Sequence, residues 1–197
     1  MPRLLYSDPS PYSAKARMGL TLANIAFESV PTDTSAEPAE LMGSNPLGKI
    51  PVLILDDGRA IFDSGVILRY ADRMSGNGVF PLEPDARLEA EMMESLGSGI
   101  CDALVAMVYE RRYRPEEKVH QDWIDRQIGK AERGFAHFEG DVPSLENGLH
   151  GGHIALRSAI GYAKLRKPDI LQGSPKLGEW ADGFDSARPD LAALLPK

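Results

Sequence analysis

The sequence predicts a small α/β domain followed by an all-α C-terminal helical domain. The first 80 residues or so alternate short strand-like runs with helical patterns, whereas the rest of the chain has only helical periodicity. Between these two textures, the stretch 76–85 carries two glycines and two prolines, which is typical of a linker. We therefore place the α/β domain at residues 1–76, the linker at 77–85 and the helical domain at 86–197.

The α/β part is expected to run β-α-β and then β-β-α. Strands are expected at 3–6, 27–30, 51–55 and 60–62. The first helix begins at Tyr12, and apolar residues at helical spacing over 66–74 predict the other. Residues 56–58 read Asp-Asp-Gly between two strand-like runs, which is a hairpin signal. The small, polar stretch 32–44 predicts a loop or a short, loose helix.

The helical part contains four segments with apolar residues at helical spacing. A long first helix is expected to bury one face, made of Leu88, Met92, Leu96, Ile100 and Leu104. The second helix covers 119–138, and we expect Pro115 to open it. The segment 154–165 is apolar almost all round, which predicts a helix in the centre of this domain. The last helix carries Leu177, Trp180, Ala181 and Phe184.

The composition argues against several classes of protein. Asp and Glu outnumber Lys and Arg by 29 to 22, and the resulting net charge of −7 argues against a protein that binds nucleic acid by neutralising phosphates. The single cysteine excludes an internal disulfide and an all-cysteine metal site. We see no signal peptide and no run near the roughly 20 apolar residues that cross a bilayer. A soluble, cytoplasmic protein without a membrane partner is therefore expected.

A hydroxyl residue lies where the first strand gives way to the first helix. Ser10 precedes Pro11, and because proline is favoured at the first helical position, Ser10 is expected to cap the helix. The free N–H groups and partial positive charge at a helix N-terminus also favour anions, so a hydroxyl there is placed to stabilise a thiolate. On this stretch alone, simple capping is the preferred interpretation.

Pro51 opens a strand that is expected to be central in the sheet. Proline suits the first residue of a strand because it cannot donate to the ladder. A cis bond between Ile50 and Pro51 would turn the N–H and C=O groups of Ile50 outward, where they could pair with a peptide-like ligand. A plain turn before the strand is the alternative.

Asp63 and Ser64 lie at the next junction of strand and helix. Ser64 begins a helix, so its hydroxyl and backbone N–H can bind a carboxylate, while Asp63 can pair with an ammonium group. The pair therefore matches the amino-acid head of a ligand. Helix capping is the alternative, and the pair taken alone favours it.

Together, these segments resemble a known family. S-P-Y-x-x-K-x-R, N-P-x-G-K-I-P-V-L and D-S-x-x-I-x-x-Y occur in this order, as in the thioredoxin-like domain of glutathione S-transferases. The helical remainder, with W-x-x-x-F-x-x-x-R-P near its end, is similar to the C-terminal domain of that family. The resemblance covers nearly the whole chain. It implies an α/β N-terminal thioredoxin-like domain followed by an all-α C-terminal helical domain.

The resemblance makes Ser10 the match of the catalytic serine or cysteine. A free thiol with a pKa of ~8.5 is only about 3% thiolate at neutral pH, so the anion of glutathione needs stabilising. A serine hydroxyl and a helix N-terminus together could supply about one to two pKa units. Serine cannot form a mixed disulfide, which disfavours a glutathione-dependent thiol reductase. Ser7 and Ser13 are further hydroxyls nearby, and Ser10 is preferred to both.

The resemblance also implies the residues that bind glutathione. Ile50 would bind the cysteinyl backbone beside Pro51 as the cis proline, and Lys49 would reach the glycyl carboxylate. Asp63 and Ser64 would hold the γ-glutamyl head.

The function that the resemblance implies is a glutathione transferase acting on small hydrophobic electrophiles. Glutathione is then the co-substrate, no metal or other cofactor is expected, and the protein is a homodimer. Asp102 more weakly resembles an acidic residue that some classes extend to the glutathione of the partner subunit. Two alternatives stay open: a glutathione-binding regulatory protein without turnover, and a glutathione-dependent lyase, isomerase or dehalogenase.

His150 and His153 mark a departure from the family pattern. The family usually begins its central C-terminal helix with a capping box, Ser or Thr followed three residues later by Asp. Here the stretch reads His150-Gly-Gly-His153, so that helix start is either weaker or capped by other means. A metal-binding pair is the alternative, which the lack of further ligands disfavours. The tail after Trp180 is also short, so little chain remains to cover an electrophile site.

Three other groups have simpler interpretations. Cys101 lies in a dense apolar helix and is expected to be a buried, inert thiol. His120 and His137 lie among charged residues and are expected to be solvated.

A basic cluster follows the long helix. It consists of Arg111, Arg112 and Arg114. The cluster is either a solvated helix end or a means of attracting anionic substrates, and Glu residues nearby offset much of its charge.

Overall fold

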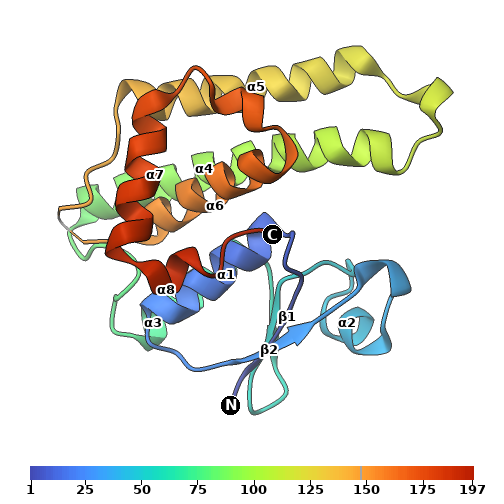
Figure 1. The fold of residues 1–197 in the computed structure, drawn as a ribbon. Coiled ribbons are helices and arrows are strands. Elements are labelled where there is room, and N and C mark those ends of the chain that lie inside the picture. Colours follow the sequence, from blue (N-terminus) through green and yellow to red (C-terminus); the bar gives the residue numbers. More distant parts are fainter. Residues whose placement is uncertain (147) are drawn as a thin grey trace.

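The computed structural model describes residues 1–146 and 148–197 (Figure 1). A four-stranded sheet with flanking helices forms the N-terminal part, and helices alone form the rest. In Figure 1 the helical part lies above the sheet and its helices. The predicted fold class is therefore confirmed, while the limits of the domains and of the linker stay a prediction.

The sheet is mixed, with strand order β2-β1-β3-β4. Its strands are β1 (Arg3–Tyr6), β2 (Glu28–Pro31), β3 (Val52–Ile54) and β4 (Ala60–Ile61). Strands β1 and β2 are parallel, whereas β1 pairs with β3 and β3 with β4 in antiparallel fashion. The strand that follows Pro51 thus lies inside the sheet, as predicted.

Four helical segments belong to this part. They are α1 (Pro11–Leu22), the 3₁₀ turn η1 (Thr34–Ala36), α2 (Ala39–Ser44) and α3 (Ser64–Met74). The turn η1 and the short α2 match the expectation of a loop or a short helix. Helix α1 contacts α3 on one side and α6 of the helical part on the other, so the helix that follows Ser10 lies at the junction of the two parts.

The helical part is built around α4 and α6. Its segments are α4 (Pro84–Arg112), η2 (Glu116–Lys118), α5 (Gln121–Gly140), α6 (Gly151–Arg166), η3 (Pro168–Leu171), α7 (Pro175–Ala187) and α8 (Pro189–Ala192). Residues 151–163 of α6 are all buried, which confirms the central helix. Helices α4 and α6 approach closely at Gly97, where a Cβ atom would lie 2.8 Å from the carbonyl carbon of Ala155. Helix α8 was not foreseen.

Parts of the predicted helical pattern were wrong. Leu88 and Met92 were expected on the buried face of the first helix, but they are 55% and 58% exposed. Trp123 in the second helix is 43% exposed. In the first half of α4 the buried positions include Ala90 and Glu94, small or charged residues that an apolar pattern does not count. Trp123 lies in the first turn of α5, near the end where α4 and α5 extend beyond the other helices (Figure 1).

Pro115 does not open α5. It precedes the 3₁₀ turn η2, and α5 begins only at Gln121. His120 caps α5, because its Nδ1 accepts a hydrogen bond of 3.1 Å from the backbone N–H of Trp123. His120 and His137 are both exposed, as expected.

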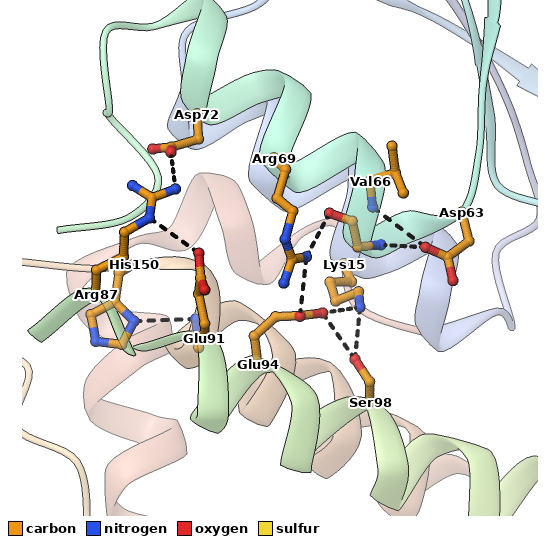
Figure 2. A network of polar contacts seen from close by, with 12 residues as sticks. Lys15, Asp63, Val66, Arg69, Asp72, Arg87, Glu91, Glu94, Ser98 and His150 are labelled. Carbon is orange, nitrogen blue, oxygen red and sulfur yellow. Dashed lines mark hydrogen bonds and ion pairs between the residues drawn. The ribbon is translucent and has the colours of Figure 1, made fainter. Parts of the chain in front are cut away.

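The segment between α3 and α4 is fixed by one buried carboxylate. Asp72 accepts hydrogen bonds from the backbone N–H groups of Val79 and Phe80, at 3.1 and 2.8 Å. Its other oxygen pairs with Arg87 of α4 at 2.8 Å (Figure 2). The end of α3 is thereby tied to the start of α4.

Helix α4 is the one helix of residues 1–146 and 148–197 that is long and apolar enough to cross a membrane by length and composition. The sequence analysis expected no such segment. In the structure α4 lies against α5 and α6 and carries the buried, ion-paired Glu94. Helix α4 therefore packs within the helical part, against these two helices.

Candidate functional site

A cleft of about 380 Å³ lies between the α/β part and the helical part. Every predicted site residue lines it: Ser10, Lys49, Ile50, Pro51, Asp63, Ser64 and Asp102. Of the opposite wall, the sequence analysis named only Arg112, as part of a basic cluster. This wall includes Val105, Tyr109, Arg112, Tyr162 and Arg166 from α4 and α6.

Ser10 is the N-cap of α1, with Pro11 as the first helical residue. Its Oγ accepts a hydrogen bond of 3.2 Å from the backbone N–H of Ser13. That bond uses a lone pair of the oxygen, so the hydroxyl hydrogen is still free to donate to an anion in the cleft. Capping and thiolate stabilisation are thus compatible. Of the other two hydroxyls, Ser7 lines the cleft and Ser13 is buried beneath it.

The loop before β3 is held by a residue to which the sequence analysis gave no role. The bond between Ile50 and Pro51 is cis, as expected. The buried side chain of Asn45 donates from Nδ2 to the carbonyl of Lys49 over 2.8 Å. Gly48 has a φ of +60°, a backbone conformation that favours glycine. The Lys49 side chain is exposed at the mouth of the cleft.

Asp63 caps α3. The sequence analysis gave this capping role as the alternative to binding the amino-acid head of a ligand. Its Oδ1 accepts from the N–H groups of Gly65 and Val66 at 3.0 and 3.4 Å (Figure 2). Ser64 is buried as the first residue of the helix, where backbone N–H groups have no partner within the helix. The N-termini of α1 and α3 therefore both open on the same cleft, and both favour negative charge.

A buried ion pair holds these helix ends in place. Lys15 of α1 lies 2.5 Å from Glu94 and 2.7 Å from the hydroxyl of Ser98, both on α4 (Figure 2). Arg69 of α3 lies 3.5 Å from the other oxygen of Glu94. Burial acts to raise the pKa of Glu94, but its three partners outweigh burial and hold the pKa below its usual value. Helices α1, α3 and α4 are thus joined at one charged carboxylate.

Across the cleft, the Tyr12 hydroxyl donates to Oδ1 of Asp102 over 2.5 Å. Burial, and then this hydrogen bond, raise the pKa of Tyr12 above its usual range. Asp102 therefore contacts α1 of its own chain, and the role that the resemblance gave it toward a partner subunit stays a prediction.

Comparison with known proteins identifies the family. Residues 9–74 match the family model of the glutathione S-transferase N-terminal domain. The chain is also 31% identical to the GST-like protein YibF of Escherichia coli (strain K12), over 98% of this chain and 91% of that protein. The protein belongs to the glutathione S-transferase family. It is a GST-like transferase, and a glutathione S-transferase from Methylobacillus flagellatus KT with glutathione bound has the same fold, with a TM-score of 0.90, 31% identity and full coverage of both chains.

A further relative carries the name of an isomerase. The chain is 27% identical to the maleylacetoacetate isomerase of Rhizobium meliloti (strain 1021), over 91% of this chain and 92% of that protein.

The glutathione S-transferase capping box is replaced here by two histidines. The N–H of Gly152 donates to Nδ1 of His150, and the N–H of His150 donates to Nδ1 of His153, both over 3.1 Å. His153 Nε2 lies 3.0 Å from the carbonyl of Ser144, so both rings act as neutral acceptors at Nδ1. Central helix α6 is therefore capped by other means. Both Nδ1 atoms are engaged with backbone, and among residues 1–146 and 148–197 no three His, Cys, Asp or Glu side chains form a metal-binding group.

The remaining predictions concern Cys101 and the basic cluster. Cys101 is buried as expected, and burial raises its pKa to about 12, so this thiol is not a nucleophile near neutral pH. Of the basic cluster, Arg111 bonds to Gln121 at 2.7 Å and Arg114 pairs with Glu110 at 2.7 Å, both away from the cleft. Arg112 alone of the three lines it.

Proposed function

We propose that this glutathione S-transferase joins the thiolate of glutathione to small electrophiles, in the cytoplasm and without a metal or other cofactor. The observation that carries the proposal is the state of Ser10. Its hydroxyl caps α1 as an acceptor, so its hydrogen is free to donate to sulfur at the positive end of the helix.

The other cleft residues fit the tripeptide. The backbone of Ile50 would pair with the cysteinyl unit, Asp63 and Ser64 would hold the γ-glutamyl head, and Lys49 would meet the glycyl carboxylate. Each lies in the same cleft as Ser10. The two helix N-termini in that cleft favour both the thiolate and the carboxylate of the γ-glutamyl head.

The proposed reaction has two steps, deprotonation of the thiol and attack of the thiolate on the electrophile. The thiol of bound glutathione releases its proton to solvent, and the Ser10 hydroxyl donates a hydrogen bond to the sulfur anion. Sulfur then forms a bond to the electrophilic carbon while the leaving group departs with its electron pair. A thiol pKa lowered from ~8.5 by about one to two units would raise the thiolate fraction at pH 7 roughly 8- to 25-fold.

The homodimer stays part of the proposal. Leu88 and Met92 lie one turn apart on α4, and both side chains are more than half exposed. A second copy that covers these apolar groups would remove them from water.

A second candidate is a glutathione-dependent isomerase. The similarity to the maleylacetoacetate isomerase along nearly the whole chain favours an isomerase over a lyase or a dehalogenase. The same thiolate would add to an unsaturated carbon and leave again after rotation, so the two reactions share the site. A binding protein without turnover remains the third candidate.

The test has two stages. The purified protein is first loaded on immobilised glutathione and eluted with free glutathione. The eluate is then offered 1-chloro-2,4-dinitrobenzene, and a conjugate is sought by absorbance and mass spectrometry, with maleylacetone as the isomerase substrate. Retention with conjugate supports the transferase, and isomerised product without conjugate supports the isomerase. Retention without any product supports the binding protein, whereas failure to bind glutathione refutes all three.

A further inference from the structure

Two arginines lie in the helical wall of the cleft without an acidic partner. Arg112 is in the last turn of α4 and Arg166 in the last turn of α6. Neither takes part in an ion pair among residues 1–146 and 148–197. Arg111 and Arg114, which flank Arg112 in the sequence, do form ion pairs, with Glu116 and Glu110. The cleft thus keeps two guanidinium groups available for a ligand.

The two guanidinium groups belong to one local cluster. Arg112 lies over the ring of Tyr109 at 5.9 Å, and Arg166 lies over the ring of Tyr162 at 5.7 Å. Both arginines line the same cleft as Tyr162, whose pKa burial raises while Arg166, and to a smaller degree Arg112, act to lower it. The Nε atom of Arg166 is buried and has no hydrogen-bond partner in the described part of the chain. A buried donor without a partner is unfavourable, so the Arg166 side chain is not held in place by a hydrogen bond at Nε.

The acidic residues of the cleft do not neutralise this cluster. Asp63 caps α3, and Asp102 accepts from Tyr12. We propose that Arg112 and Arg166 bind a carboxylate of the electrophile, so that the substrates of this enzyme are electrophiles with an acidic group. This inference rests on the proposed function and narrows its substrates from small electrophiles to those with an acidic group. The sequence analysis had expected a small hydrophobic electrophile. The planar fork of arginine suits a carboxylate, which it can bind through two parallel hydrogen bonds.

The position of the cluster limits the shape of the substrate. Asp102, bonded to Tyr12 near the thiolate site, lies ten residues before Arg112 on α4, or about 15 Å along the helix axis. Long side chains on a helix point back toward its N-terminus, so Arg112 covers part of that distance. Val105 and Tyr109 line the interval. The electrophile therefore carries its acidic group several bonds away from the reacting carbon, beyond an apolar middle.

The test compares two product-like ligands that differ only at their end. S-hexylglutathione and S-(5-carboxypentyl)glutathione have side chains of equal length, one ending in a methyl group and the other in a carboxylate. Their dissociation constants are measured by calorimetry on the full-length protein and on the variants Arg112→Gln and Arg166→Gln. Arg111→Gln and Lys164→Gln are the matched controls, because they remove the same charge from the same two helices outside the cleft.

We expect each cleft variant to weaken the carboxylate ligand about tenfold, the effect of losing one charge-assisted pair, and to leave S-hexylglutathione within about twofold. The controls should change neither ligand. An equal loss of affinity for both ligands would mean that the arginines bind glutathione itself or support folding. Unchanged affinity for the carboxylate ligand would mean that the arginines do not bind the carboxylate. Either result overturns the inference. If Arg166→Gln does not fold, Arg112→Gln alone decides, since its side chain is exposed. Failure of the unaltered protein to bind either ligand would instead refute the proposed function.

Discussion

The hydroxyl of Tyr12 donates to the carboxylate of Asp102, and this bond joins α1 to α4 across the cleft. The hydroxyls of Tyr12 and Ser10 therefore differ in their hydrogen bonds. The hydrogen of Tyr12 is committed to Asp102, whereas Ser10 accepts from backbone and keeps its own hydrogen free. The raised pKa of Tyr12 keeps its hydroxyl protonated, but that hydrogen is bonded to Asp102. We therefore expect Ser10, and not Tyr12, to donate to the thiolate.

The first prediction concerns Ser10. Ser10→Ala should lower kcat/KM for conjugation at neutral pH about 3- to 10-fold, because the helix N-terminus remains and the pKa of bound glutathione rises by about one unit. The pKa is read from the thiolate absorbance of the complex as a function of pH. Ser10→Thr, which keeps both the hydroxyl and the helix cap, should retain most activity. An unchanged thiol pKa in the alanine variant would remove Ser10 from this role.

Tyr12 should behave differently. Tyr12→Phe removes the bond to Asp102 but no donor to sulfur, so the thiol pKa should stay within about 0.3 units of the unaltered protein. The thermal midpoint should fall, because the interface between α1 and α4 loses a charge-assisted hydrogen bond. A pKa rise as large as that of the serine variant would contradict the division of roles.

The buried pair of Lys15 and Glu94 yields a stability prediction. Lys15→Met leaves the carboxylate of Glu94 buried beside a single remaining cation, Arg69, and should cost about 3–5 kcal/mol in the free energy of unfolding. The double variant Lys15→Met with Glu94→Leu should recover much of that loss, since Arg69, which loses Glu94 as its partner, is partly exposed to water. Urea unfolding measures both. Arg59→Met, at an exposed pair with Asp57, is the control and should change stability by less than about 1 kcal/mol.

The histidine cap of α6 predicts a dependence on pH. Burial, and then His153, lower the pKa of His150 from 6.5 to about 4. The unfolded chain therefore binds a proton more readily than the folded one between these values, so stability is complete above pH 6.5 and falls as the pH drops toward 4. His153 has a lowered pKa as well and adds to the same trend.

The measurement is the free energy of unfolding in urea at pH 7.0, 5.5 and 4.5. His150→Asn keeps a capping side chain without a titrating ring, so its stability should vary less over this range. His137→Asn, at an exposed position, should keep the full dependence. Identical pH profiles for all three proteins would show that the cap does not titrate with folding.

The proposed dimer can be tested at α4. Met92→Glu places a charge on the apolar pair formed with Leu88 and should shift the protein from dimer to monomer in sedimentation velocity. Leu165→Glu, at a partly exposed leucine on α6, should leave the dimer intact. A monomer without either substitution would exclude the dimer proposal.

The sequence predicted the cleft residues of the α/β part better than those of the opposite wall. Ser10, Pro51 and Asp63 each lie at a junction between two elements, and local chemistry determines such junctions because proline and capping residues act on their immediate neighbours. The helix start at His150 was also recognised as unusual, although the reciprocal bonds of the two rings were not foreseen.

The opposite wall could not be found in this way. Tyr162 and Arg166 are recognisable as helical residues, but which side of α6 meets the cleft depends on how α4, α1 and α6 pack together. The dependence on helix packing also explains why Leu88 and Met92 were wrongly expected to be buried. An apolar pattern places them on a buried face, whereas in α4 that face belongs to Ala90 and the paired Glu94. Asn45 was missed because its role is a single bond to a loop carbonyl.

The backbone N–H of Lys197 donates to the carbonyl of Asp8 over 3.1 Å, in the loop that leads to Ser10. Figure 1 shows this end of the chain returning beside α1. During synthesis on a ribosome, the first strand and helix emerge early, but this loop gains its closing contact only after residue 197 has left the exit tunnel. The loop that leads to Ser10 therefore takes one of its contacts from the far end of the helical part, so its order depends on both parts of the chain having folded.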